Sequence, residues 1–169
     1  MIKLTSKEDT DQMKDRLQCL QYLATHTVEV GLTSTASERS RVLLAIHEHG
    51  APAMHIPARP VVKPALAQAS TRAEMSAAMR KACAAANAGD LSGTTSALED
   101  AGKAGVDGIH AYIDKGIPPP NSPITLSGGW IRNPVSKKPV HIKGKSGTTT
   151  LVDTGQLYNA FQFEVVSKF

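Results

Sequence analysis

Two proline-rich stretches limit most strongly where regular structure can form in this 169-residue chain. The first, "APAMHIPARPVVKP" at 51–64, holds four prolines, and the second, "IPPPNSP" at 117–123, holds four more. Proline fixes φ and removes a backbone donor, so neither stretch can continue through a helix interior or a central strand. We expect the first stretch to be a shaped connector and the second to be an extended, polyproline-like arm.

Apolar residues recur at helical spacing in the part of the chain that precedes the connector. In "TSKEDTDQMKDRLQCLQYLA" they are Met13, Leu17, Leu20 and Ala24. In "SERSRVLLAIHEH" they are Val42, Ala45, Ile46 and His49. We expect two helices that bury these stripes, the second of which ends at Gly50.

Two further helices are expected between the proline stretches. An alanine-rich segment runs from about Pro64 to Ala88 and is closed by Gly89. The next segment, "TTSALEDAGKAGVDGIHAYIDKG", contains Gly102, Gly105 and Gly108. Each of these glycines costs a helix about 1 kcal/mol relative to alanine. Either another backbone approaches closely at these glycines, or the helix is marginal until it is packed.

Two segments alternate apolar and polar residues, as strands do. Val28 and Val30 alternate around Glu29 in "HTVEVGL", and "FQFEVV" alternates at the end of the chain. The sequence therefore predicts an α+β domain with several helices on a small, mainly antiparallel sheet. We expect a single domain over 1–169. Its parts would be an N-terminal helix (1–26), a strand and helical core (27–114), an extended arm and basic loop (115–147), and a short capped helix with the last strand (148–169).

Composition and charge set limits on the core and on the compartment. Aromatic residues make up 4% of the chain, and much of the 41% of hydrophobic residues is alanine. A core of this kind is thin, so partner chains would supply part of the stability. The sequence has no signal-peptide pattern and no apolar run long enough to span a bilayer. With Cys19 and Cys83 far apart, we expect reduced thiols and a soluble protein made in a reducing compartment, without a membrane partner.

The triplet Asp153-Thr154-Gly155 is how a retroviral-type aspartic protease presents its catalytic carboxylate. Such an enzyme needs two carboxylates that share a proton, and it needs most of its strands after the triplet. Here Gln156 stands where Ala or Ser is typical, and 14 residues follow Gly155. We predict instead that Asp153 or Thr154 caps a short helix over "GQLYNA". Asp153 is then not a catalytic acid.

Three histidines, His47, His49 and His55, lie close together in the sequence. Two residues on a helix correspond to about 200° of rotation, so His47 and His49 would face opposite ways. His49 continues the apolar stripe, and we expect it to be packed. We therefore predict no metal site. The stretch "GKSG" at 144–147 lacks the upstream glycine of a phosphate-binding loop, and we predict no cofactor and no catalytic residue.

The segment between Asp114 and Asp153 has no acidic residue and six cations, which are Lys115, Arg132, Lys137, Lys138, Lys143 and Lys145. Trp130 and His141 lie among them. A basic loop with an aromatic residue could contact phosphates, which would suit a small nucleic-acid-binding accessory protein that uses residues 115–145. A solvated loop, or an interface with an acidic partner, explains the same charges, and we favour this second interpretation.

Three stretches, in this order, resemble a known family. They are "IHEHGAPAMHIPARPVVKPAL", "PPNSPITLSGG" and "LVDTGQLYNAFQFEVV". They are similar to the tail-completion and neck proteins (minor tail component, virion morphogenesis) of long-tailed bacteriophages. The resemblance implies a non-enzymatic virion protein that is assembled in the bacterial cytoplasm and lies at the neck or tail end. Its partners would be copies of itself in a ring, with six or twelve copies as natural numbers, together with portal or adaptor, tail-terminator or tail-tube proteins. DNA threading the ring would be bound without sequence specificity.

The resemblance also implies which residues matter. Pro57 and Pro60 would stiffen the backbone so that Arg59 projects toward a carboxylate or backbone group of a neighbouring subunit. The full set of structural or interface residues would be Glu48, Gly50, Ile56, Pro57, Arg59, Pro60, Pro120, Asn121, Pro123, Asp153, Thr154, Gly155 and Leu157. Residues that face a partner or DNA would be Arg132, Lys137, Lys138, Lys143 and Lys145.

Overall fold

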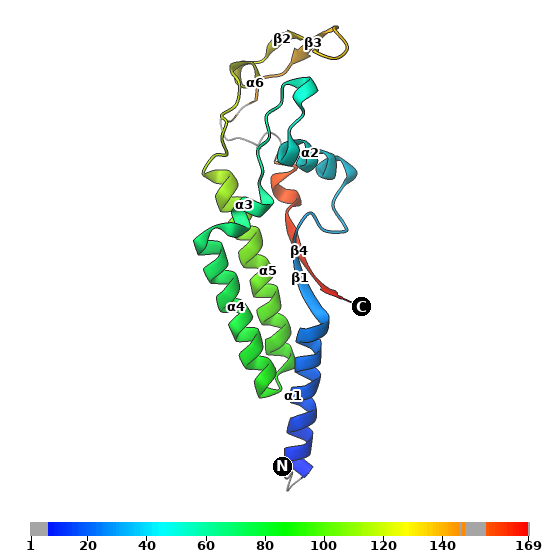
Figure 1. Ribbon diagram of the computed structural model, residues 1–169, viewed down its shortest axis with the longest axis vertical. Coiled ribbons are helices and arrows are strands. Elements are labelled where there is room, and N and C mark those ends of the chain that lie inside the picture. The colour runs from blue at the N-terminus through cyan, green and yellow to red at the C-terminus, as the bar shows by residue number, and fades with distance from the viewer. Residues whose placement is uncertain (1–6, 146, 148–154, 169) are drawn as a thin grey trace. The chain divides into compact units, whose positions relative to one another are not determined.

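The computed structural model describes residues 7–145, 147 and 155–168, which combine helices with two small antiparallel sheets (Figure 1). This confirms the α+β prediction. The helices are α1 (Lys7–Thr25), α2 (Glu38–His49), α3 (Val62–Ala67), α4 (Ala69–Ala88), α5 (Leu91–Asp114) and α6 (Pro123–Ser127). The strands are β1 (His26–Gly31), β2 (Gly129–Arg132), β3 (Pro139–Ile142) and β4 (Gln162–Ser167), and two short 3-10 helices are η1 (Pro52–Met54) and η2 (Tyr158–Ala160). Within the described ranges, none of the helices combines the length and apolarity that crossing a membrane requires.

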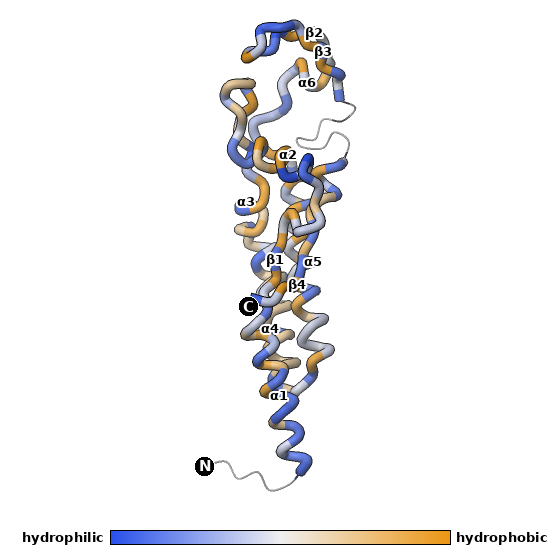
Figure 2. Tube along the Cα trace, turned by 90° about the vertical axis from the view of Figure 1, so that its right-hand side faces the viewer, coloured by the Kyte–Doolittle hydropathy of each residue, from blue (hydrophilic) through white to orange (hydrophobic). Residues whose placement is uncertain are grey.

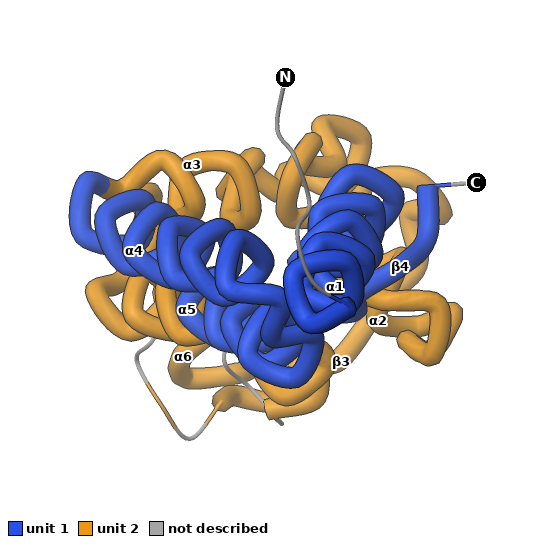
Figure 3. Tube along the Cα trace, turned by 90° about the horizontal axis from the view of Figure 1, so that it is seen from below, with its two compact units in different colours: residues 1–31, 69–106, 162–169 blue, residues 32–68, 107–161 orange. Residues whose placement is uncertain are grey.

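The chain forms two compact units, which Figure 3 colours separately. Unit 1 comprises residues 1–31, 69–106 and 162–169, and therefore holds α1, β1, α4, most of α5, and β4. Unit 2 comprises residues 32–68 and 107–161, and holds α2, α3, the last turns of α5, α6, β2 and β3. Both proline stretches belong to unit 2.

Unit 1 is built from helices and the strand pair that joins the two ends of the chain. β1 and β4 are antiparallel, with Val28 opposite Val165 and Val30 opposite Phe163. Buried Ala82, Ala97 and Leu98 form a core against which Tyr22, Leu23, Val28 and Val165 pack. Alanine at these positions lets α4 and α5 contribute to a core with few large side chains.

The glycines of α5 mark close approaches to the strands. A Cβ on Gly102 would overlap the ring of Phe163 and lie 2.9 Å from the Phe163 Cβ. A Cβ on Gly105 would lie 2.9 Å from Cγ2 of Val30. Something does approach closely at both positions, but the prediction that it is another backbone was wrong, because the approaching atoms belong to side chains.

The predicted apolar stripes of the first two helices are not buried in this chain. Leu17 is 58% exposed and Leu20 is 43% exposed, and the buried residue of α1 is Cys19. Figure 2 shows hydrophilic colour along the first turns of α1. In α2, Val42 is 49% exposed and His49 is also exposed. The contacts of α2 with the connector are made instead by the carboxylate of Glu48 and by the backbone carbonyl oxygen of His47.

Two further predictions about the middle of the chain were wrong. The alanine-rich helix is two helices, because Gln68 adopts an extended backbone (φ −58°, ψ 138°) between α3 and α4. Its composition contains no local signal for that break. The segment at 115–147 is not only an arm and a loop, since it contains α6 and an antiparallel hairpin in which Trp130 pairs with His141. At the tip, Asn133 Oδ1 accepts the N–H groups of Val135 and Ser136, which is turn chemistry.

Candidate interaction site at the two proline stretches

Arg59 joins the connector to the proline arm within unit 2. Its Nε donates to the carbonyl oxygen of Pro119 (2.8 Å), and its Nη2 donates to the carbonyl oxygen of Pro120 (3.1 Å). The residue is only 7% exposed. Burial lowers the pKa of the guanidinium from its usual value. Two of its donors thus bind the arm of its own chain, while the expected contact of Arg59 with a neighbouring subunit stays a prediction.

Glu48 fixes the other end of the connector. Its Oε1 accepts the backbone N–H groups of Val61 (2.7 Å) and Val62 (2.9 Å) at the start of α3. These donors have no partner inside a helix, and a negative charge there is favoured by the helix dipole. Val61 is completely buried. The contact therefore ties the end of α2 to a core residue at the start of α3.

The turn between α2 and the connector explains the need for Gly50. Gly50 has φ +72°, and a Cβ there would lie 2.8 Å from the backbone N of Ala58. Ala51 and Ile56 form an isolated antiparallel bridge, which closes the turn. The N–H of Arg59 then donates to the carbonyl oxygen of His47 (2.6 Å). These contacts press the connector against the end of α2.

The arm continues into α6 through residues that the sequence had singled out. Pro123 is the first residue of α6, with Ser122 at the N-cap position. Ser122 Oγ is 2.8 Å from Thr125 Oγ1. Pro57, Pro60 and Pro120 are exposed, and Asn121 is half-buried.

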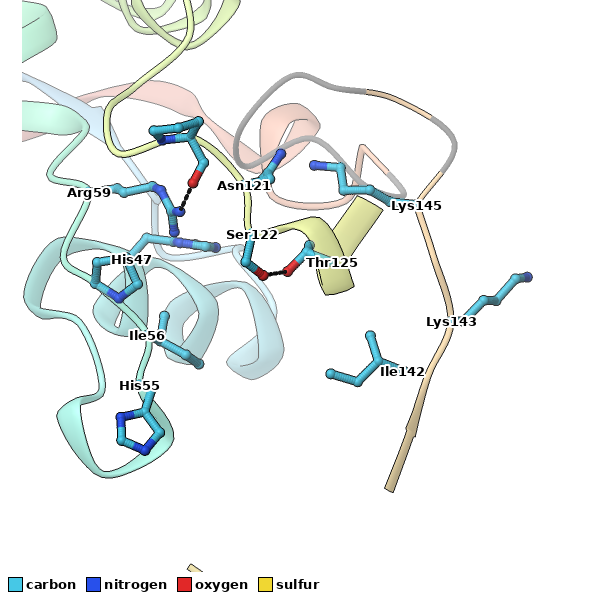
Figure 4. Close-up of a pocket in the computed structure, with 12 residues that line it drawn as sticks. His47, His55, Ile56, Arg59, Asn121, Ser122, Thr125, Ile142, Lys143 and Lys145 are labelled. Carbon is cyan, nitrogen blue, oxygen red and sulfur yellow. Dashed lines mark hydrogen bonds between the residues drawn. The ribbon is translucent and has the colours of Figure 1, made fainter. Parts of the chain in front are cut away.

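A groove of about 420 Å³ lies beside the contact of Arg59 with the arm, within unit 2. Its lining residues are His47, His55, Ile56, Pro57, Arg59, Pro120, Asn121, Ser122, Thr125, Ile142, Lys143 and Lys145. In Figure 4, His47 and Arg59 line one side, while Ile142, Lys143 and Lys145 line the opposite side. The groove thus brings together residues from α2, the connector, the arm, α6 and β3, and from the segment that follows β3.

His47 is a residue of this site that the sequence interpretation did not select. Its Nδ1 is buried and has no hydrogen-bond partner among the residues that the structure describes. Burial, followed by the positive charges of Arg59 and Lys145, lowers the pKa of His47 below its usual value of 6.5. The spacing of His47 and His49 did indicate that they face opposite ways, but the apolar stripe favoured His49 as the packed residue.

The predicted cations divide into two groups. Lys143 and Lys145 line the groove, whereas Arg132, Lys137 and Lys138 do not. The latter lie on or beside the β2–β3 hairpin, where Trp130 is 72% exposed. The Trp130 ring lies edge-on to His141, with 5.1 Å between the ring centroids.

The third motif is only partly visible. Asp153 and Thr154 lie outside the described residues, so their capping role stays a prediction. Gly155 has φ +75°, Leu157 is 5% exposed, and the helix that follows is the 3-10 turn η2. His110 Nε2 is 2.9 Å from the carbonyl oxygen of Tyr158, and the two rings stack. This contact attaches η2 to α5 inside unit 2.

The site consists of side chains that hold the connector and the arm in place, beside a groove lined by cationic residues. Its charged side chains Arg59 and Glu48 bind the chain's own backbone carbonyls and amides. Within the described part of the chain, no group of three or more His, Cys, Asp or Glu residues could hold a metal ion. No family model matches this sequence, and comparison with curated proteins and with solved structures gives no match. Function must therefore be argued from the chain's own residues.

Glu48→Ala is expected to lower the free energy of unfolding by about 2 kcal/mol, because two N–H groups at the start of α3 lose a charged acceptor. Glu48→Gln keeps an acceptor oxygen and should recover at least half of that loss. Urea unfolding followed by circular dichroism measures both variants. Equal stability of the Ala variant and the wild type would contradict the role given to this carboxylate.

His47 should make the fold less stable in mild acid. Because the pKa of His47 is lowered in the folded chain, the unfolded chain takes up a proton at a higher pH. The contribution of neutral His47 is therefore complete above pH 6.5 and is lost as the pH falls toward the folded pKa.

His47→Gln should accordingly flatten the dependence of the urea midpoint on pH between about pH 7 and pH 5. His141→Gln is the matched control, because His141 is exposed and should leave the slope unchanged. The same slope in the His47 and His141 variants would refute the assignment.

Proposed function

We propose that this chain is a structural, non-enzymatic virion protein of a tailed bacteriophage, which joins the head to the tail or completes the tail end. One observation supports this most. Residues of the "IPARP" connector and of the "PPNSP" arm, separated by 60 positions between Arg59 and Pro119, are joined by direct hydrogen bonds. Two stretches that resemble the same family in sequence are thus in direct contact in the folded chain. Two similarities that arose by chance would give no reason to expect such a contact.

The geometry also suits binding of a partner protein to a surface that is already ordered in the free chain. Arg59 holds the arm against the connector before any partner arrives, so less backbone freedom is lost on binding. The exposed prolines present a stiff edge. In this proposal the partners are further copies of the chain in a ring, of six or twelve, and the portal or adaptor, tail-terminator or tail-tube proteins of the same virion. DNA in the lumen would be contacted without sequence specificity.

The experiment that tests this function is location. Intact particles are purified, heads are separated from tails, and each fraction is probed for this chain with quantitative mass spectrometry. A fixed, low copy number at the head–tail junction or tail end is the expected result. Protein found free in the lysate and missing from particles would reject the proposal.

The hairpin favours a second candidate function, nucleic-acid binding. Trp130 is 72% exposed, and Arg132, Lys137 and Lys138 lie in the same acid-poor segment. Such a combination provides stacking and phosphate contacts together. Retained DNA affinity near physiological salt, a steep salt dependence, and a loss of affinity in Trp130→Ala would support this function over the structural one.

A further inference from the structure

The β2–β3 hairpin has two faces that differ in exposure. In its register, Trp130 lies opposite His141, and Arg132 lies opposite Pro139. Because side chains alternate between the two faces of a strand, these four residues share one face, which we call the outward face. All four are exposed, whereas Ile131 on the other face is half-buried. The hairpin therefore presents an aromatic and cationic surface to the solvent.

The indole ring of Trp130 is the largest apolar group on the outward face. The residue is 72% exposed, and it is the one tryptophan in the sequence. Its ring plane is inclined by 64° to that of His141, with 5.1 Å between the ring centroids. The two rings are therefore not stacked, and an indole of this exposure can accept a planar partner. A nucleic-acid base is such a partner, because every base has a π-face.

Two cations lie beside the indole ring, toward the tip of the hairpin. Arg132 is two residues further along β2 than Trp130, which places it about 7 Å away on the same face. Lys138 directly precedes β3 and is exposed. Lys137 has a different role, because its Nζ donates to the carbonyl oxygen of Pro134 within the tip (2.6 Å). Arg132 and Lys138 are thus the cations placed to contact phosphates next to a base on Trp130.

The charge of unit 2 favours a polyanion as the partner of the outward face. The sequence of unit 2 holds ten Lys and Arg residues and five Asp and Glu residues, whereas unit 1 holds nine and ten. Residues 129–142 alone contribute three of these cations. A positive field attracts nucleic acid and supplies phosphate contacts that do not depend on sequence. An acidic polypeptide would match the charge as well, but a flat indole beside cations matches a base and its phosphates together.

A single strand suits the outward face better than a duplex. In a duplex each base is stacked between its neighbours, so a base reaches Trp130 only after it has been unstacked and unpaired, which is unfavourable. Proteins that read a duplex groove place hydrogen-bonding side chains against the edges of the bases. The outward face offers instead an indole and a proline ring with one arginine. A single strand exposes the faces of its bases without the cost of unpairing.

We propose that the outward face of the β2–β3 hairpin binds single-stranded nucleic acid, with a base stacked on Trp130 and the adjoining phosphates bound by Arg132 and Lys138. This binding rests on the second candidate function, nucleic-acid binding, and deepens it by naming the class of nucleic acid and the role of each residue. The side chain of Asn133 orders the tip, so the face is formed before the ligand arrives. Stacking and phosphate contacts are common to all bases, and binding is therefore without sequence preference.

The test is a titration of the full-length protein, followed by the fluorescence of Trp130 and by the anisotropy of a labelled strand. The probes are an oligothymidine of about 16 nucleotides, a duplex of the same length and an abasic strand of the same length. The oligothymidine should quench the indole fluorescence saturably and bind at least about tenfold more tightly than the duplex. The abasic strand keeps the phosphates, so it should bind about tenfold more weakly than the oligothymidine and without quenching.

Matched variants, measured by anisotropy, separate stacking from general charge. Trp130→Ala should weaken binding of the oligothymidine by about tenfold, and Trp130→Phe, which keeps an aromatic ring, should recover most of that loss. Arg132→Gln should reduce the slope of log affinity against log salt by about 0.7, the value for one phosphate contact on a single strand. Lys115→Gln removes an exposed cation of unit 2 that lies outside the hairpin, and it should leave the affinity unchanged.

Three results would overturn the proposal. Equal or tighter binding of the duplex would reject the single strand as the ligand, while nucleic-acid binding itself would stand. Unchanged affinity in Trp130→Ala would place the binding site outside the outward face. No saturable binding of any probe at about 0.05 M salt would reject the second candidate function as well. None of these results bears on whether the chain is present in particles, so the virion function is tested separately.

Discussion

Arg59→Ala is expected to lower the free energy of unfolding by about 3 kcal/mol and to release the proline arm from the connector. The loss has two sources. The carbonyl oxygens of Pro119 and Pro120 lose charged donors, and a side chain that is 93% buried leaves space behind it. Urea unfolding measures the stability, and limited proteolysis measures the release, since cleavage near residues 117–123 should become faster.

Two further variants locate the cause of that effect. Arg59→Lys keeps the charge but cannot reach both carbonyl oxygens with a planar fork, so it should recover less than half of the loss. Arg132→Ala removes an exposed arginine from the hairpin and should stay within about 0.5 kcal/mol of the wild type. Unchanged cleavage of the arm in Arg59→Ala would mean that Arg59 does not hold the arm.

The sequence predicted those elements whose signals are local. Gly89 closes α4 at φ +79°, and β1 and β4 follow the alternation of their apolar residues. The glycines of α5 carried a cost for which the sequence left two explanations open, and at Gly102 and Gly105 side chains of β4 and β1 do approach closely. Backbone conformation and hydrophobic period act within a few residues, so one sequence is enough to read them.

The direction in which a helix faces depended on distant residues. α2 has an apolar stripe, yet its contacts to the connector come from Glu48 and from the carbonyl oxygen of His47. Polar contacts to backbone groups 13 residues away, as for Glu48 and Val61, leave no periodic trace. The acceptors of Arg59 within the chain were not predicted for the same reason. Two prolines beside it indicated a stiff backbone, but the acceptors are 60 and 61 positions further on.

The candidate groove was even less visible in the sequence. Lys143 and Lys145 were selected for their charge. Ser122 and Thr125 lay in the stretch "PPNSPITLSGG" but were not among the predicted interface residues, and Ile142 carried no distinguishing signal. Their convergence with His47 requires the arm, α6 and β3 to fold back beside α2. The one hint was the run of cations without acids between Asp114 and Asp153, and it did not indicate which of those cations would lie beside His47.

Gly102→Val is expected to lower the free energy of unfolding by about 3 kcal/mol. The first atom of any side chain at this position overlaps the ring of Phe163 and lies 2.9 Å from its Cβ. Helix propensity alone predicts the opposite sign, since valine suits a helix interior better than glycine by a few tenths of a kcal/mol. The sign of the measured change in urea unfolding therefore decides between packing and propensity.

Lys103→Val is the matched control, because it places the same side chain at the next position of α5, which is exposed. It should cost less than about 1 kcal/mol, through propensity alone. In a Gly102→Val, Phe163→Ala double variant the overlapping ring is gone. The double variant should therefore lose less unfolding free energy than the sum of the losses in the two single variants. Strict additivity would show that the cost of Gly102→Val does not come from Phe163. The close approach of β4 to α5 would then not be what requires glycine at this position.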